Sequence, residues 1–315
     1  MKFIEPSFRV QPNYALNICE KLESIGRVCY RSEDKITDGS CCKFIENLIK
    51  RGHFSILEHV NFNFKIQGTP SRKFLLLLGN YQGITITQVS NVLNVNMNLR
   101  NAVELSDFDG YSEFLKLICI NEKCLLSCFK NTRPEIFTDS QEVTTFIYRD
   151  KMKITFIPFK KVAKNDNTIF HTVFFQIPRG IWDELARHRK NACACESSRY
   201  CLYSKDKFDG QITFNKPIWW NEKGTICHTV WNLTFWIIEK SYLFLTKFLP
   251  AQYARGVLPL DYSVKCCVTA SREQWKHILK LRTSEGAHPE MRKIMLNLQK
   301  ALNITDDELK SPNLK

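Results

Sequence analysis

The sequence predicts a mixed α/β (α+β) fold, because segments with strand composition alternate with segments of helical spacing. FHTVFFQI at 170–177 and SVKCCVT at 263–269 are typical of strands. REQWKHILKLR at 272–282 and PEMRKIMLNLQKAL at 289–302 repeat their apolar residues at helical intervals. The 315 residues suffice for one large domain or two small ones, and no repeat or low-complexity tract marks a linker.

The amino-terminal segment predicts two helices followed by a strand. Apolar residues at helical spacing predict helices over 14–31 and 40–51, and Gly52 follows the second as a helix stop. VNFNFKI at 60–66 alternates apolar and polar residues, which indicates a half-buried strand.

The middle of the chain, residues 69–165, has the composition of a folded segment but shows no chemical motif. LLLLGNYQGITITQVSNVLNVN and FIYRDKMKITFIPF predict strands, and YSEFLKLICINEKCLLSCF predicts a helix. We interpret the basic cluster KITFIPFKKVAKND at 153–166 as a solvated strand end and loop.

After the strand at 170–177, PRG at 178–180 predicts a turn and IWDELARHRK at 181–190 a helix that carries the arginines. QITFNKP at 211–217 predicts another strand. TVWNLTFWIIEKSYLFLTKFL at 229–249 predicts a buried helix, since its three charged residues argue against a membrane span.

The charge of the chain predicts anionic ligands. Lys and Arg number 45 against 32 Asp and Glu, which gives a net charge of +13. The 13 cysteines include no CxxC pair, and the first ten residues do not resemble a secretory leader. We therefore expect a cytoplasmic protein with reduced thiols and no metal site.

The stretch RHRKNACACESSRY at 187–200 carries four cations among small side chains. On the expected helix, Glu184, Arg187 and His188 share one face. Arg199 and Tyr200 add donors suited to phosphate oxygens. The alternative is an exposed helix face with ordinary charge pairs.

RHR, a seven-residue gap, and then Ser within ESSRY resemble the signature of the flavin-dependent thymidylate synthases. Four further blocks resemble motifs of the longer members of this family, in the family's order. These blocks are GRVCYRSEDK at 26–35, GHFSILEHVNFNF at 52–64, ARGVLPLDY at 254–262 and LRTSEGAHPEMR at 281–292, with RYCLYSKDKF at 199–208 continuing the signature.

The resemblance implies roles for individual residues. It places His53, Ser55, Glu58, Arg187, His188 and Arg189 at the FAD or folate. It places Glu184, Ser197, Arg199, Arg255 and Arg292 at dUMP, with Ser197 and Arg292 in catalytic roles. Taken alone, the histidines would more often be structural and the arginines surface residues.

The chain departs from the family pattern at four positions. Ala192 replaces a usual Ser, Cys195 a usual Gln, Ser271 a usual Asn and His288 a usual Gln. Cys193 and Cys195 could be proposed as nucleophiles beside the cations. The family's chemistry needs no enzyme nucleophile, so we interpret both as packing residues.

The implied activity is methylation of dUMP to dTMP. The resemblance implies 5,10-methylene-tetrahydrofolate as carbon donor, NADPH as reductant and bound FAD as hydride donor. It also implies a single domain over 1–315, with a central sheet, flanking helices and 69–165 as an insertion of unknown role. Family members are homotetramers with active sites between subunits, and neither a membrane nor a nucleic acid is expected. The alternative is a non-catalytic relative that binds nucleotides or nucleic acid.

Overall fold

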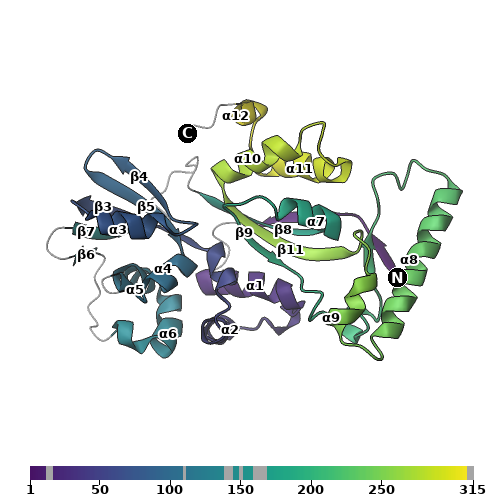
Figure 1. Cartoon of the computed structure of the whole chain (residues 1–315), viewed down its shortest axis with the longest axis horizontal. Helices are drawn as coiled ribbons and strands as arrows, with labels where there is room; N and C mark the ends of the chain where they lie inside the picture. Colours follow the sequence, from purple (N-terminus) through teal and green to yellow (C-terminus); the bar gives the residue numbers. More distant parts are fainter. Residues whose placement is uncertain (12–16, 109–110, 138–144, 149–151, 159–168, 311–315) are drawn as a thin grey trace.

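The structure is a computed structural model that describes residues 1–11, 17–108, 111–137, 145–148, 152–158 and 169–310 (Figure 1). Its strands form three sheets on which helices pack, so the predicted mixed α/β class is confirmed. The first predicted helix is confirmed from Ile18, but its first residues, within 12–16, lie outside the described part. The carboxyl end of the basic cluster at 153–166 also lies outside it.

A four-stranded antiparallel sheet of order β2-β8-β11-β9 lies at the centre. Its strands are β2 (Ser7–Gln11), β8 (Phe170–Pro178), β11 (Ser263–Ser271) and β9 (Ala192–Cys195). β8 and β11, both predicted, pair along their whole length. The sequence pattern did not predict β2 or the short β9.

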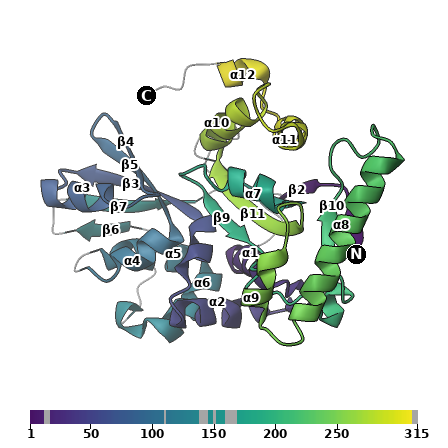
Figure 2. The same ribbon diagram turned by 45° about the vertical axis from the view of Figure 1, so that its right-hand side comes forward.

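Helices cover both faces of the central sheet. They are α1 (Ile18–Tyr30), α2 (Ser40–Lys50), α7 (Arg179–Leu185), α10 (Arg272–Arg282) and α11 (Pro289–Ala301). α10 and α11 lie on one side, and α1 and α2 on the other (Figures 1 and 2). Asn17 and Glu20 form a capping box that starts α1, and the Ser271 side chain caps α10. The central sheet is therefore buried between two helical layers.

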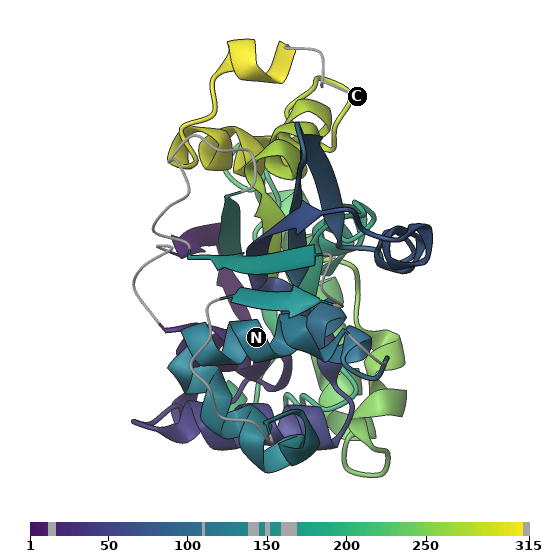
Figure 3. The ribbon, with the colours of Figure 1, turned by 90° about the vertical axis from the view of Figure 1, so that its left-hand side faces the viewer.

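A second antiparallel sheet joins the GHFSILEHVNFNF block to residues 69–165, the segment that the resemblance implies to be an insertion. Its order is β4-β5-β3-β7-β6, and β3 (Asn61–Gly68) belongs to the GHFSILEHVNFNF block. The insertion supplies β4 (Thr85–Val89), β5 (Val92–Asn98), β6 (Thr145–Tyr148) and β7 (Met152–Ile157). Figure 3 views the molecule from the side of this sheet. Since β3 sits in the middle, the sheet cannot form without the insertion.

The helices of the insertion pack on α1 and α2 in one continuous core. They are α3 (Arg72–Gly79), α4 (Leu99–Leu105), α5 (Ser112–Asn121) and α6 (Lys123–Thr132). The prediction of a strand at LLLL was wrong, because Phe74 and Leu78 bury one face at helical spacing and Ser71 caps the helix start. The helix predicted over the 111–129 segment is two helices, which meet at Glu122.

The long apolar helix α8 (Thr225–Leu245) contradicts the prediction of a buried helix. Its buried residues are Phe235, Glu239 and Tyr242, whereas Ile226 is 81% exposed and Val230 is 60% exposed. Figure 2 shows α8 at the edge of the molecule. Glu239 is tolerated inside because its carboxylate accepts a hydrogen bond from the Ile212 amide at 2.9 Å. Among the described helices, none is long and apolar enough to span a membrane.

The remaining elements are short. β1 (Lys2–Ile4) pairs in parallel with β10 (Thr213–Asn215). Two further α-helices are α9 (Ala251–Ala254) and α12 (Asp306–Lys310). The 3-10 helices are η1 (Glu33–Lys35), η2 (Phe54–His59), η3 (Pro134–Phe137), η5 (Asp206–Phe208) and η6 (Arg255–Val257). All thirteen cysteines are free thiols in this fold.

Candidate functional site

A cleft of about 1190 Å³ lies between the central sheet and the insertion. On one side it is lined by Arg187, Arg189 and Lys190, which we call the basic wall. On the other side the insertion contributes an amide wall, which consists of Asn80, Gln82, Asn96, Asn98 and Asn101. The middle of the chain, which showed no chemical motif, therefore forms one side of this cleft.

The RHR motif does not lie on a helix, contrary to the prediction. α7 ends at Leu185, and the His188 amide donates to the Leu185 carbonyl at 3.2 Å in a turn. The carbonyl of Glu184 accepts from Arg282 instead of from a further helical turn. Lys190 then takes a left-handed φ of 65°, which turns the chain into β9. The motif thus lies on the loop between α7 and β9, where Arg187, Arg189 and Lys190 are exposed.

Arg282 joins two predicted site residues that belong to different roles. Its Nη1 donates to Glu184 Oε2 at 2.8 Å, and its Nε donates to His188 Nε2 at 2.9 Å. Burial, followed by the charges of Arg282 and His277, lowers the pKa of His188 to about 4. His188 is therefore neutral near pH 7 and accepts a hydrogen bond through Nε2.

Glu58 reaches the same cleft from η2 and is held by the insertion. Arg100 donates to Glu58 Oε1 at 2.6 Å and to Glu104 Oε1 at 2.7 Å. Since Arg100 and Glu104 both lie on α4, the insertion fixes the orientation of a motif carboxylate. Arg100 thus ties the insertion to the GHFSILEH block.

His59 of the same block is a buried structural residue. Its Nδ1 lies 2.8 Å from Thr269 Oγ1, and that hydroxyl also bonds Thr172 Oγ1 at 2.8 Å. Burial, with a smaller effect of Lys21, lowers the pKa of His59 to about 3. The neutral imidazole therefore anchors η2 to the central sheet, and Thr269 itself lines the cleft.

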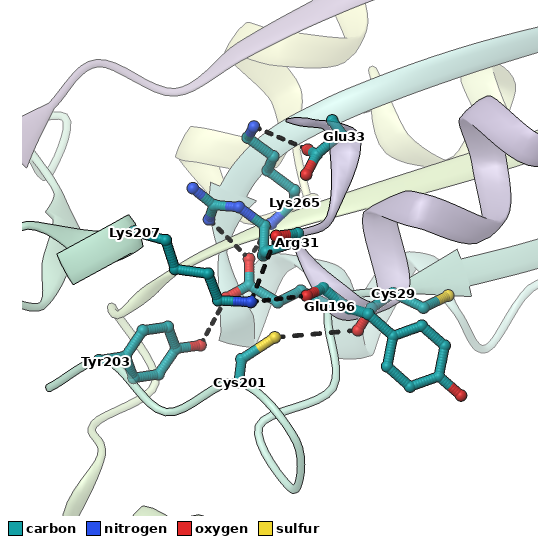
Figure 4. Close-up of polar contacts among 9 residues, drawn as sticks. Cys29, Arg31, Glu33, Glu196, Cys201, Tyr203, Lys207 and Lys265 are labelled. Carbon is teal, nitrogen blue, oxygen red and sulfur yellow. Dashed lines mark hydrogen bonds and ion pairs between the residues drawn. The ribbon is translucent and has the colours of Figure 1, made fainter. Parts of the chain in front are cut away.

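A buried network fixes the ESSRY segment after β9 (Figure 4). The Glu196 carboxylate, with no exposed side-chain surface, pairs with Arg31 at 2.9 Å and accepts from Tyr203 Oη at 2.7 Å. Its Oε2 also accepts from the Lys265 amide at 3.2 Å. Burial and the Glu196 charge hold the pKa of Tyr203 well above its usual range. The Glu196 carboxylate of the signature thereby contacts both the GRVCYRSEDK block, through Arg31, and the RYCLYSKDKF segment, through Tyr203.

The network presents Ser197, Ser198 and Arg199 at the carboxyl end of β9. Arg255 Nη1 donates to Ser198 Oγ at 3.4 Å, and the Arg199 guanidinium lies 5.6 Å from the ring centre of Tyr200. Both arginines are exposed. They form a second cationic group, which does not line the cleft.

The structure thus divides the predicted site residues. Glu58, Arg187, His188 and Arg189 line one cleft. Ser197, Arg199 and Arg255 belong to the second group, whereas Glu184 is held by Arg282, and Arg292 Nε donates to the Thr283 carbonyl at 3.0 Å. His53, just before η2, and Ser55, on η2, are exposed and do not line the cleft, so their roles stay predictions.

The two cysteines of the signature lie on β9, where they pair with β11. Burial raises the pKa of Cys193 to about 12 and raises that of Cys195 as well. Both are therefore protonated at neutral pH, which agrees with a packing role. Of the four departures, Ala192 and Ser271 line the cleft. Ser271 retains a helix-capping function there.

Sequence reasoning missed three groups at this site. Arg282 lies inside the LRTSEGAHPEMR block. Its place in a block that resembles a family motif was the signal from which it could have been predicted. Arg100 and the amide wall were given no role from the sequence, because their contacts depend on where the insertion folds. Among the described residues, no group of three or more His, Cys, Asp or Glu is arranged to hold a metal ion.

A sequence profile described as "Thymidylate synthase complementing protein" matches residues 14–77 and 167–304, more than half of the chain. The chain belongs to this family. The resemblance to flavin-dependent thymidylate synthases is thereby confirmed, and the unmatched residues between the two segments form most of the insertion. No curated protein sequence matches the chain.

Solved structures of two similar proteins are distant in sequence. Thymidylate synthase X from Helicobacter pylori, with FAD and dUMP, shares 19% identity over 45% of this chain and 74% of that chain, with a TM-score of 0.36. The UMP/dUMP methylase PolB from Streptomyces cacaoi, bound with 5-Br dUMP, shares 14% identity over 96% of this chain and 91% of that chain, with a TM-score of 0.39. TM-scores this low do not support an assignment, so the family assignment rests on the match to the sequence profile.

Proposed function

We propose that this chain methylates dUMP to dTMP, with 5,10-methylene-tetrahydrofolate as carbon donor and NADPH as reductant of a bound FAD. The observation that carries the proposal is the cleft in which Glu58 and the RHR residues meet. They come from two separated motif blocks, and the family profile covers both blocks.

The cleft fits a flavin dinucleotide by charge and size. Arg187 and Arg189 are exposed, and in the described part of the chain neither guanidinium has a carboxylate partner, so both are free to bind phosphates. The amide nitrogen of Asn191, also in the cleft, is buried without a described hydrogen-bond acceptor. When bound, FAD would supply the reduction that converts a transferred methylene into a methyl group.

The second cationic group fits the substrate. Arg199 and Arg255 would bind the phosphate of dUMP, and the Ser197 hydroxyl would hold the pyrimidine edge. Arg292 would stabilise negative charge that develops on the pyrimidine carbonyls during methylation. The Glu196 network would keep Ser197 and Arg199 oriented, since the loop that carries these two residues is anchored at Glu196.

The proposed assembly is a homotetramer with active sites between subunits. α8 exposes Ile226, Val230, Leu233 and Ile237 at helical spacing, and so large a one-sided apolar stripe is unusual for a monomer. The proposed domain organisation is one domain over 1–315, with 69–165 as its insertion. The shared core of α1, α2 and the insertion helices supports it.

The experiment is a steady-state assay of dTMP formation from dUMP, methylene-tetrahydrofolate and NADPH, after the protein has been stripped of flavin. Product that depends on added FAD supports the proposal, and UMP should be assayed beside dUMP because PolB is described as a UMP/dUMP methylase. A folded protein that makes no product and binds DNA in a salt-dependent way would favour the binding-protein alternative.

A further inference from the structure

The amide wall is an uncharged surface placed opposite cations. Its five residues lie on the α3–β4 connection, on β5 and at the start of α4, and all belong to the insertion. The carboxylates of Glu58 and Glu104 next to it are already paired with Arg100. The wall therefore offers neutral amide donors and acceptors, whereas the opposite wall offers exposed cations.

Asn98 and Asn101 are the most organised members of this wall. Asn98 Oδ1 accepts from the Asn101 amide at 2.8 Å and so caps α4. The Asn101 side chain donates weakly to the Gln82 carbonyl at 3.4 Å, and its Oδ1 has no donor among the described residues although the residue is only 3% exposed. A buried acceptor without a partner is unfavourable in the free protein and indicates a site that a donor from water or a ligand completes.

Gly83 allows the chain to pass close to these amides. It has a φ of +98°, and a Cβ at this position would lie 2.6 Å from Asn98 Nδ2 and 3.0 Å from Asn101 Oδ1. A residue with a side chain would therefore be strained and would also push the two amides apart. The loop and the amides form one built surface.

The two walls together match the chemistry of a dinucleotide. The phosphates of such a ligand need cations, and an adenine presents an adjacent donor and acceptor, which the unpartnered Asn101 Oδ1 and the neighbouring Asn98 Nδ2 can pair with between them. The volume of about 1190 Å³ exceeds that of a usual small-ligand pocket, so it can hold both ends of one molecule. The glutamate tail of a folate, by contrast, would need cations that the amide wall lacks.

We propose that the amide wall of the insertion binds the adenine of the dinucleotide whose pyrophosphate lies on the basic wall, an inference that rests on the proposed flavin-dependent function. Asn98 and Asn101 are then specificity-determining residues for FAD over FMN. In this proposal, residues of the insertion contact the cofactor directly.

The test compares flavins in the full-length protein after bound flavin has been removed. The double variant Asn98→Ser, Asn101→Ala removes both amides, and Ser at 98 retains a helix cap. Two lost hydrogen bonds predict that FAD binds roughly tenfold more weakly. FMN, which has the same ring and a phosphate but no adenine, should bind as it does to the wild type, and ADP should bind more weakly to the variant. Asn94→Ser, on β5 but outside the cleft, is the matched control and should change nothing.

Each outcome is decisive. Equal losses of FAD and FMN affinity in a variant with wild-type thermal stability would overturn the adenine assignment. Unchanged FAD affinity with a higher Michaelis constant for the folate would assign the wall to the pterin and also overturn it. Asn98→Ser alone, which keeps the cap, replaces the double variant if that protein unfolds. Wild-type protein that binds no flavin would contradict the proposed function itself. Failure of the proposed function is therefore distinguishable from failure of the adenine assignment alone.

Discussion

The guanidinium of Arg282 lies 2.9 Å from Nε2 of His188, so a fixed cation holds a neutral imidazole at the cleft. The same guanidinium holds Glu184 through its carboxylate and its carbonyl. One residue outside the RHR motif therefore decides how that motif is oriented. It links the side chain assigned to dUMP with a side chain assigned to the flavin.

We expect Arg282→Met to raise the pKa of His188, because a positive charge beside the imidazole is removed. The rise should be partial, since burial is the larger cause of the lowered pKa. An NMR titration of His188 measures it, and kcat/KM for dUMP should fall by about tenfold or more with the loss of orientation. Arg282→Lys retains the charge and is the control. An unmoved His188 pKa in a folded Arg282→Met protein contradicts the account.

The Glu196 network predicts a loss of stability in Glu196→Gln. The variant keeps an acceptor for Tyr203 but leaves the partly buried Arg31 without its carboxylate. The free energy of unfolding should fall by about 2–4 kcal/mol, more than the ~1 kcal/mol expected for Tyr203→Phe. Denaturant unfolding checks both values. Equal effects of the two variants would show that the ion pair contributes nothing.

Arg199→Ala should weaken dUMP binding far more than it lowers stability. Arg199 is exposed and contacts only the Tyr200 ring among the described contacts, so the fold does not depend on it. A lost charged hydrogen bond to phosphate predicts at least a tenfold rise in the dUMP dissociation constant. Lys205→Ala, another exposed cation nearby, is the matched control. Unchanged dUMP affinity removes Arg199 from the substrate site.

The apolar stripe of α8 predicts that Leu233→Glu disrupts the assembly. Leu233 is 56% exposed in a single chain, so the charge should leave the subunit folded but oppose its burial between subunits. Sedimentation should show a tetramer for the wild type and smaller species for the variant. Lys280→Glu, a reversal of an exposed charge on α10 and therefore outside the α8 stripe, should leave the assembly intact. A wild-type protein that sediments as a monomer contradicts the proposal.

The pKa of His59 predicts an acid-sensitive fold. Its pKa is about 3 in the folded protein and near 6.5 when unfolded, so the unfolded state binds the proton first as pH falls. Stability should therefore be constant above pH 6.5 and fall below it, by up to about 1.4 kcal/mol per pH unit from this residue. Urea unfolding at several pH values measures the slope. His59→Gln should be less stable at pH 7 but should show a shallower slope. Parallel slopes would contradict the assignment.

The sequence predicted the parts of the fold whose pattern is local. β8, β11, α10 and α11 each carry a complete periodic pattern, and the motif blocks led to Glu58 and RHR, which meet in one cleft. The helix predicted over 181–190 is confirmed to Leu185 but wrong beyond it, because a contact at the end of α7 comes from Arg282, about a hundred residues later. The prediction that α8 is buried was wrong, because apolar composition does not distinguish a core helix from a helix whose apolar face is exposed in the single chain. The amide wall could not be predicted from the sequence, since only the folded insertion brings Asn98 into the same cleft as Arg189.

A single-turnover experiment tests the central claim most directly. Protein reconstituted with FAD is reduced anaerobically, and dUMP and methylene-tetrahydrofolate are then added while the visible absorbance of the flavin and the amount of dTMP are followed. The account predicts that oxidised flavin returns as dTMP forms, in equal amounts. Flavin that stays reduced, with no dTMP, in a protein that binds both FAD and dUMP would contradict it.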